Sequence, residues 1–365
     1  MKNSNSNNSR KINFGSGPAM LPEEVLKEAA DAVVDYQGDG LSILEIPHRG
    51  QKFDSILEES KELVKELCEL QGDHEVLWLQ GGGRMQFAMI PMNFLGDGQR
   101  AGYLDSGHWS RDAIQSANVF GATEVLSSSK QNNYSALPDL PASFPEDLAY
   151  VHITTNNTIY GTQWNGLPLS EPPLIADMSS DILSRKREYD KCALFYAAVQ
   201  KNVGPAGATL AVVRKDMLKQ IKRKLPAVFD YREQVKSKSV LNTPPVFAIY
   251  VSLLMLRWTK SKTISVLEQE SIAKSEMLYN EIDRNSVFAP VVKVKDHRSR
   301  MNVCFTAATK EAEKRFADLC HARNIVGVEG HRSVGGFRAS LYNAMAPDAV
   351  AQLVSVMQEF EQTAT

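Results

Sequence analysis

The chain has 365 residues, of which 43% are hydrophobic and 23% are charged, so it can bury a substantial core and is expected to form two domains. Forty-one Lys and Arg residues stand against 43 Asp and Glu residues, and the net charge of −2 argues against binding nucleic acid or an anionic membrane through a general basic surface. The four cysteines show no close pairing, so no metal site or disulfide scaffold is indicated, and a reducing, cytoplasmic location fits best.

Neither the N-terminal segment nor the longest apolar run suggests a membrane protein. The Asn- and Ser-rich segment 1–11 lacks the apolar core of a secretory signal and is predicted to be a disordered tail. The longest apolar run, 246–258, is interrupted by Ser252 and is shorter than the roughly 18 to 20 residues that span a bilayer. We therefore expect a protein that does not cross a membrane.

The part of the chain that follows the N-terminal tail has the pattern of an α/β domain. Amphipathic helices are predicted over 21–36 and 54–70. Short apolar runs then predict strands buried on both faces, at 76–80, 101–106, 149–154, 173–178, 193–199 and 208–214. Helix-length segments at 84–94 and 109–119 lie between some of them, which indicates βαβ units and a mainly parallel sheet.

Beyond residue 260 the pattern becomes that of a smaller α+β domain. A helix is predicted over 264–284, a strand over 298–307 and a closing helix over 347–363. We therefore expect a large α/β domain over 12–259 and a small domain over 260–365. The first residues of the large domain could pack against the small one.

Two charged residues at strand ends suggest a pyridoxal phosphate site. Lys201 follows the strand 193–199 and precedes a Gly-Pro turn, at the carboxyl edge of a sheet, where open α/β folds bind ligands. Asp177 lies in an apolar strand, where a carboxylate needs a partner to offset its desolvation. Pyridoxal phosphate requires a lysine amine and an acid opposite its pyridine nitrogen. Taken singly, each residue could instead be structural.

A glycine-rich loop, QGGGR at 80–84, lies between a predicted strand and a predicted helix. Its backbone amides could bind a phosphate, and Arg84 adds a cation. The alternative is a dinucleotide site, because Gly81 and Gly83 follow a strand and Asp105 lies near the end of the next one. Gln86 occupies the position of the third glycine, so that fingerprint is incomplete.

Aromatic and cationic loop residues could complete a site for an anionic ligand. Trp109 offers a flat face for stacking on a ring, although a single Trp at such a junction is more often core. Two His-Arg pairs, ending at Arg49 and Arg332, lie in loops flanked by Gly or Pro, and Arg338 is close to the second. Arginines bind carboxylate and phosphate through paired hydrogen bonds, so a substrate with both groups would use several.

Longer motifs cover nearly the whole chain after the tail: NFGSGPAMLPEEVL, IPHRG, LQGGGRMQFAM, GHWS, ADMSSDILSR, QKNVGPAG, NTPP, RSRMNV and GHRSVGGFRASLYNAM. In these motifs the chain resembles the phosphoserine aminotransferase family, class V aminotransferases among the fold-type I pyridoxal phosphate enzymes. The resemblance implies an α/β fold with a mainly parallel, seven-stranded sheet in the large domain and a smaller C-terminal α+β domain. Two departures, YAAVQK in place of YAGAQK and Asn157 in place of a glutamate, remove no group that the chemistry needs.

The resemblance also implies roles for individual residues. Lys201 would bond the cofactor and act as the base, and Asp177 would hold the pyridine nitrogen. The other cofactor ligands would be Gly83, Arg84, Trp109, Thr158 and Gln200, with Asn242 and Thr243 supplied by the neighbouring subunit. The substrate acids would be contacted by Ser16, Arg49, His331, Arg332 and Arg338.

The implied reaction moves the amino group of L-glutamate to 3-phosphohydroxypyruvate and forms O-phospho-L-serine and 2-oxoglutarate in L-serine biosynthesis. The implied working unit is a homodimer with shared active sites. The sequence leaves open whether a related four-carbon substrate of pyridoxine biosynthesis is also used. The alternatives are a class V transaminase of the alanine-glyoxylate type, whose substrate lacks the phosphate, and a dinucleotide-dependent dehydrogenase.

Overall fold

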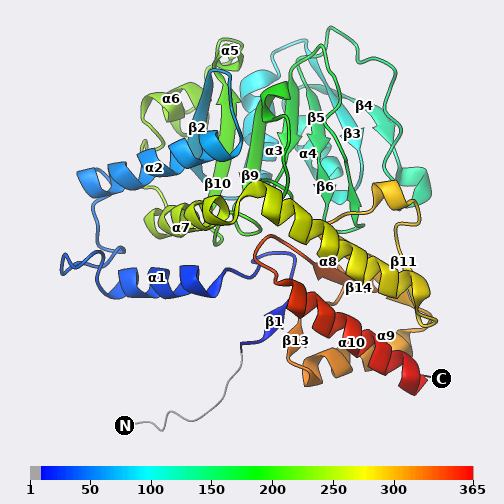
Figure 1. Ribbon diagram of the computed structural model, residues 1–365. Coiled ribbons are helices and arrows are strands. Elements are labelled where there is room, and N and C mark those ends of the chain that lie inside the picture. The colour runs from blue at the N-terminus through cyan, green and yellow to red at the C-terminus, as the bar shows by residue number, and fades with distance from the viewer. Residues whose placement is uncertain (1–9, 365) are drawn as a thin grey trace.

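A seven-stranded sheet forms the centre of the larger part of the molecule (Figure 1) in this computed structural model, which describes residues 10–364. Its strand order is β2-β10-β9-β8-β5-β3-β4. The strands are β2 His74–Gln80, β3 Arg100–Asp105, β4 Ala122–Ser128, β5 Val151–Thr154, β8 Leu174–Asp177, β9 Cys192–Ala198 and β10 Ala208–Arg214. Only β10 runs against its neighbours, so the predicted mainly parallel α/β sheet is confirmed.

The edge strand β4 is the one strand of this sheet that the apolar runs did not predict. Its sequence, ATEVLSS, is half-exposed along its length, and Val125 is 50% exposed. An edge strand with one solvated side carries no continuous apolar run, which is why a search for fully buried strands passes over it.

Helices cover both faces of the sheet, because alternate residues of each strand point to opposite faces. Val76 and Trp78 of β2 pack with one group of helices, and Leu77 and Leu79 pack with the other. The first group is α1 Glu23–Val34, α2 Gln51–Leu67 and α7 Val246–Lys262, and the second is α3 Gly83–Phe94 and α4 His108–Ala117. The apolar run 246–258 is thus a buried core helix, and no helix within residues 10–364 has the length and apolarity needed to cross a membrane.

The C-terminal part has its own core, which lies below the sheet in Figure 1. It contains α8 Ile264–Arg284, β11 Phe288–Pro290, β12 Asn302–Ala307, α9 Lys310–Ala322, β13 Ile325–Val326, β14 Phe337–Ser340 and α10 Pro347–Ala364. The predicted strand 298–307 therefore begins later than expected. A small antiparallel sheet of order β11-β12-β14 packs there around aromatic rings such as Phe305 and Phe316.

The N-terminal residues join this C-terminal core. Strand β1, Ile12–Asn13, pairs in parallel with β13, and Phe14 is buried among the aromatic residues. Residues 1–9 of the predicted disordered tail lie outside the described residues. The boundary expected between residues 259 and 260 falls inside α7, and the division into two domains stays a prediction. The remaining short elements are β6 Asn156–Asn157, β7 Thr162–Gln163, α5 Lys215–Leu218 and α6 Tyr231–Lys236.

A buried lysine connects α8 to the loop that follows β14. Lys274 is 1% exposed, and its amine donates hydrogen bonds to the carbonyl oxygens of Tyr342 (3.0 Å) and Met345 (2.8 Å). The Tyr342 hydroxyl in turn donates to the carbonyl of Ser16. Burial lowers the pKa of Lys274 to about 8 from 10.5. A neutral amine has two N–H donors, so deprotonation leaves both of these hydrogen bonds possible.

We predict that the wild type gains stability relative to Lys274→Met as pH rises through this range. The unfolded lysine, with a pKa of 10.5, binds more protons than the folded one between about pH 8 and 10.5, so deprotonation favours the folded state there. The difference in free energy of unfolding should grow by up to about 3 kcal/mol. Urea unfolding of both proteins at each end of the range measures it, and a constant difference contradicts the assignment.

Candidate active site

The carboxyl ends of β2, β3, β5, β8 and β9 meet at one edge of the sheet and open into a cavity of about 450 Å³. Parallel strands bring their ends together in this way, whatever the distance between them in the sequence. The cavity is lined by these predicted site residues: Ser16, Gly83, Arg84, Trp109, Thr158, Asp177, Gln200 and Lys201.

Lys201 and Asp177 lie at the ends of the neighbouring strands β9 and β8. The turn at Lys201 is fixed because the amide of Ala19 donates to the carbonyl of Gln200 at 2.9 Å. Asp177 is 6% exposed and accepts a hydrogen bond from the amide of Ser179 at 2.9 Å. Within the described residues Lys201 and Asp177 form no direct ion pair, so the space between them is open to a ligand.

Both of these side chains are shifted toward their neutral forms. Burial lowers the pKa of Lys201, with Asp177 opposing the effect and Arg338 adding to it. Burial likewise raises the pKa of Asp177, and the charge of Lys201 opposes that shift. A lysine with a lowered pKa has a larger neutral fraction, which is the form that attacks a carbonyl carbon.

Trp109 forms a flat wall of the cavity at the start of α4. Gly107, two residues earlier, has a φ of +150°, and a Cβ there would lie 1.8 Å from the side-chain nitrogen Nδ2 of Asn157, so only glycine fits this approach. The indole Nε1 donates to the hydroxyl of Thr158 at 2.9 Å. Lys201 Nζ lies 6.0 Å from the centre of the Trp109 ring.

The glycine loop gives the cavity a helix N-terminus. Gly82 precedes α3, and no side chain caps this end of the helix. The amide groups and the positive end of the helix dipole therefore suit an anion. Arg84 lies 5.4 Å from the Trp109 ring centre and pairs with Asp112 at 2.8 Å, so its charge is held at the mouth of the cavity.

Part of the predicted cationic group lies beside this mouth. Arg338, on β14, donates to the carbonyl oxygen of Thr158 at 3.2 Å. The ring of His331 lies 5.9 Å from that of His108, and its pKa is lowered by burial and then by the nearby Arg338. Arg332 is exposed in the same loop. The structure thus brings Arg338 to Thr158 and His331 to His108, which neighbours Trp109 in the chain.

Apart from His331, Arg332 and Arg338, three further predicted site residues do not line this cavity. Arg49 is exposed and donates to the carbonyl oxygen of Leu241 at 3.3 Å. Asn242 lines a separate hollow with Trp78 and Met85, and the carbonyl of Thr243 accepts a hydrogen bond from the side chain of Gln80. Arg49, Asn242 and Thr243 therefore belong to a surface patch beside the glycine loop, outside the chain's own cavity.

The cavity also contains polar residues that the sequence did not single out. Ser179 accepts a hydrogen bond from the amide of Ala198 at 3.1 Å and so joins the turns after β8 and β9. Asn156 and Ser180 line the cavity as well. The signal was present in ADMSSD, but a serine beside a strand end has no distinctive spacing, so only Asp177 stood out.

The residues of the dinucleotide alternative are occupied by structural contacts. The carboxylate of Asp105 accepts hydrogen bonds from the hydroxyls of Ser110, Ser128 and Tyr134. Gln86 is buried and accepts from the hydroxyl of Tyr231. Asp105 is thus already engaged by three donors, which argues against a role in binding a ribose.

Comparisons with known proteins agree with this geometry. The family model Aminotransferase class-V matches residues 12–353. The phosphoserine aminotransferase of Flavobacterium psychrophilum is 44% identical over 354 residues, which are 96% of this chain and 99% of that protein. The solved phosphoserine aminotransferase of Bacillus circulans subsp. alkalophilus is 40% identical, with a TM-score of 0.93 over 98% of this chain and 99% of that one. The PLP-bound phosphoserine aminotransferase of Trichomonas vaginalis is 33% identical, with a TM-score of 0.89 over 96% and 100%. The chain therefore belongs to the class V aminotransferase family, among the phosphoserine aminotransferases.

Proposed function

We propose that this chain is a pyridoxal phosphate (PLP)-dependent enzyme that transfers the amino group of L-glutamate to 3-phosphohydroxypyruvate, giving O-phospho-L-serine and 2-oxoglutarate. The observation that carries the proposal is the placement of Lys201 and Asp177 on neighbouring strand ends, facing one cavity beside the ring of Trp109. The full-length similarity to phosphoserine aminotransferases supports the choice of substrates.

The residues of the cavity fit PLP. The cavity has a volume of about 450 Å³, which is within the usual range for a small-molecule site. The uncapped start of α3 suits the phosphate, the Trp109 face suits the pyridine ring, and the buried Asp177 suits a cationic ring nitrogen. Gly83, Arg84, Thr158 and Gln200 line the same cavity and are the further candidate ligands.

When bound, PLP supplies an aldehyde that reacts with amines and a ring that accepts electrons from the substrate Cα. The chain supplies the proton transfers and the charge. Lys201 Nζ is the only lysine amine among the described lining residues, and we assign it the removal of the Cα proton of the amino acid. Asp177 is assigned to accept the N–H of the ring nitrogen, which keeps that nitrogen positive.

The cationic residues at the mouth are assigned to the two acidic ends of the substrate. Arg338 is held beside Thr158 and is assigned a substrate carboxylate, and Ser16, which lines the cavity, is a further candidate contact. His331 and Arg332 lie farther out, where a phosphate at the end of a three-carbon chain would lie. Glutamate and 2-oxoglutarate also carry two acids, and the α-carboxylate that all the substrates share is assigned to Arg338.

The remaining site residues support a homodimer with shared sites. Arg49, Asn242 and Thr243 lie beside the glycine loop and outside the lining of the chain's own cavity. A two-fold interface pairs the same patch on both subunits. We propose that this patch completes the phosphate and substrate sites of the second subunit.

The cysteines support a reducing location. Cys68, Cys192, Cys304 and Cys320 are all buried free thiols. Burial raises the pKa of Cys192, Cys304 and Cys320 to about 12, which makes these thiols unreactive. Free cysteines are typical of the cytoplasm, where we place the enzyme.

We predict that Lys201→Ala abolishes transamination. The purified wild type should absorb visible light through lysine-bound PLP and convert 3-phosphohydroxypyruvate with glutamate far faster than pyruvate. The variant should lack that absorbance band and lose at least about 10³-fold in kcat, because the base is gone. A spectrophotometric titration and a coupled assay measure both. A wild type that binds no PLP, or a fully active variant, would refute the proposed function.

Arg332→Ala should weaken binding of the phosphorylated keto acid selectively. Loss of one charge-assisted contact corresponds to roughly a 10- to 100-fold increase in KM for 3-phosphohydroxypyruvate. The KM for glutamate, which carries no phosphate, should change much less. Steady-state kinetics with each substrate varied separately distinguish the two, and equal increases for both substrates contradict a phosphate role.

Co-expressing two inactive variants should restore part of the activity if the two subunits share their active sites. Asn242→Asp places a negative charge against the proposed phosphate site of the partner, whereas Lys201→Ala removes the base from its own site. Co-expression of the two gives mixed dimers with one complete site each, and roughly a quarter of the wild-type activity should return. Each variant expressed alone is the control. No recovery in dimers shown to be mixed contradicts the shared site.

A further inference from the structure

We propose that Asp181 is a positioning residue of this active site: paired with Arg187 in the protein interior, it fixes the turn that carries Asp177 and the hairpin that carries Thr158, and it balances the buried charge of Arg187 near the site. The inference rests on the proposed function, because that function gives Asp177 and Lys201 their roles. Asp181 lies four residues after Asp177 but does not line the cavity. It therefore acts through other residues and not on the substrate.

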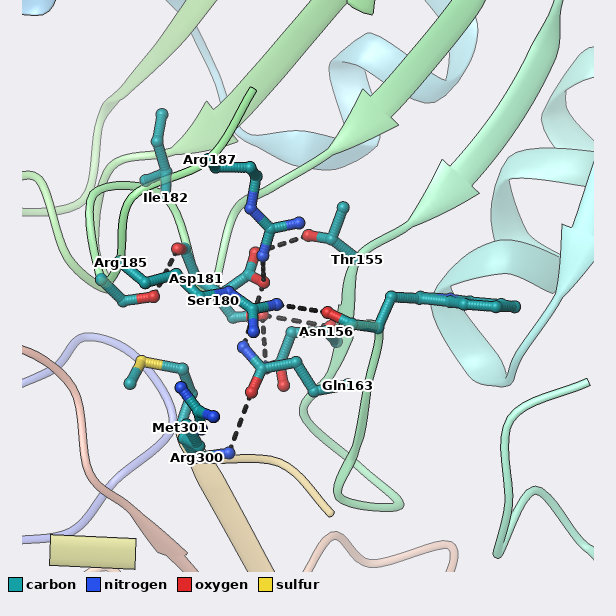
Figure 2. Close-up of polar contacts among 12 residues, drawn as sticks. Thr155, Asn156, Gln163, Ser180, Asp181, Ile182, Arg185, Arg187, Arg300 and Met301 are labelled. Carbon is teal, nitrogen blue, oxygen red and sulfur yellow. Dashed lines mark hydrogen bonds and ion pairs between the residues drawn. The ribbon is translucent and has the colours of Figure 1, made fainter. Parts of the chain in front are cut away.

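Asp181 is fully buried and has three donors (Figure 2). Its Oδ2 accepts hydrogen bonds from Arg187 Nη2 at 2.6 Å and from Gln163 Nε2 at 3.1 Å, and its Oδ1 accepts one from the hydroxyl of Thr155. These donors come from three separate segments of the chain, as Figure 2 shows. A buried carboxylate with this many donors is strongly held in one orientation.

One of these donors connects Asp181 directly to the turn after β8. The backbone amide of Thr155 donates to the carbonyl oxygen of Asp177 at 3.0 Å, and the Thr155 hydroxyl lies at the same distance from that oxygen. The amide of Asp181 also donates to the carbonyl of Met178 at 3.2 Å. The turn from Asp177 to Asp181 is thus closed on itself and bound to Thr155.

A second donor connects Asp181 to the hairpin formed by β6 and β7. Gln163 lies in β7, and its carbonyl oxygen Oε1 accepts a hydrogen bond from the amide of Arg300 at 2.9 Å. On β6, Asn156 donates to the hydroxyl of Ser180 at 2.8 Å. Thr158, which holds the Trp109 indole, lies between the two strands of this hairpin. The Asp181 carboxylate therefore helps to fix the positions of both Asp177 and the Trp109 ring.

The pair also keeps a buried charge balanced beside the cavity. The Arg187 side chain is 4% exposed, its Nε and Nη1 have no hydrogen-bond partner, and Asp181 is its only ion-pair partner in the part of the chain that the structure describes. The neighbouring Arg185 is also buried, and burial lowers its pKa to about 10, with Arg187 adding to the shift. Removing one charge of a buried pair leaves the other uncompensated.

That charge is close enough to act on the catalytic groups. The pKa of Lys201 is lowered chiefly by burial, and Asp181 is among the groups that oppose the shift, together with Asp177. The other charged groups around Arg187 and Asp181 are Arg185 and, farther out, the pair of Arg300 with Glu268. Without Asp181 the surroundings of Lys201 become more positive by one charge.

The test is a charge-balance series on holoenzyme loaded with PLP, measured by a pH titration of the visible absorbance of the lysine-bound cofactor. In Asp181→Asn the unpaired Arg187 disfavours the protonated form, so the midpoint should fall by roughly half to one pH unit. In the double variant Asp181→Asn/Arg187→Met both charges are gone, and the midpoint should return to within about 0.2 units of the wild type. A merely structural role predicts no such return.

Two further variants keep the test decisive. Glu281→Gln breaks the pair in α8 between the buried carboxylate of Glu281 and the exposed Arg284, and it should lower the melting temperature without moving the midpoint. If Asp181→Asn yields no folded holoenzyme, Arg187→Met replaces it. That variant leaves the carboxylate with its Thr155 and Gln163 donors, so the midpoint should rise.

An unchanged midpoint in Asp181→Asn with PLP bound would overturn the inference, as would a double variant shifted as far as the single one. In Arg187→Met, a midpoint that is unchanged or lower than that of the wild type would also overturn the inference. If the wild type itself binds no PLP, the proposed function fails instead. Asp177→Asn serves as the reference for direct loss of the acid and should change the spectrum without any return in the Arg187→Met background.

Discussion

Burial of charge at one edge of a sheet is the constraint on which this structure depends. Asp177 is buried and Lys201 is partly buried, and burial moves the pKa of each toward the neutral form. An arrangement of this kind is unfavourable unless a ligand with matching charges is bound or neighbouring dipoles compensate. The two side chains line one cavity without pairing directly, so the folded protein lacks a stabilising ion pair here and both groups remain available to a ligand.

The sheet topology explains how the fold meets this constraint. Strands β8 and β9 run parallel and end together, which places Asp177 and Lys201 side by side although 24 positions separate them in the sequence. The antiparallel β10 then leads the chain back from the edge after the Gly-Pro turn. Gly204 in this turn packs against α7, and a Cβ there would lie 2.3 Å from the hydroxyl of Ser252. The position of Lys201 is thus set by backbone packing more than by its own side chain.

The sequence predicted the fold and the cavity residues where local pattern and topology act together. Buried strands such as 208–214 have continuous apolar runs, and residues at their ends, such as Lys201, must gather at one edge. It missed β4, whose exposed side breaks the pattern, and it could not separate Arg49 from Arg338, because both are arginines close to glycines with no further distinguishing signal. Which loop faces which cavity depends on contacts between distant segments, and these have no periodic signal.

Asp181 illustrates the same limit most clearly. In the sequence it is one more acid in ADMSSD, outside the apolar strand that singled out Asp177. The structure separates the two by their partners, because Asp181 meets a buried arginine whereas Asp177 meets an amide and an open cavity. A carboxylate whose oxygens are already engaged in the interior is not available to a ligand, but it can hold its neighbours in place. Two acids four residues apart therefore have different roles. Asp177 is available to a ligand in the cavity, whereas Asp181 is engaged in structural contacts.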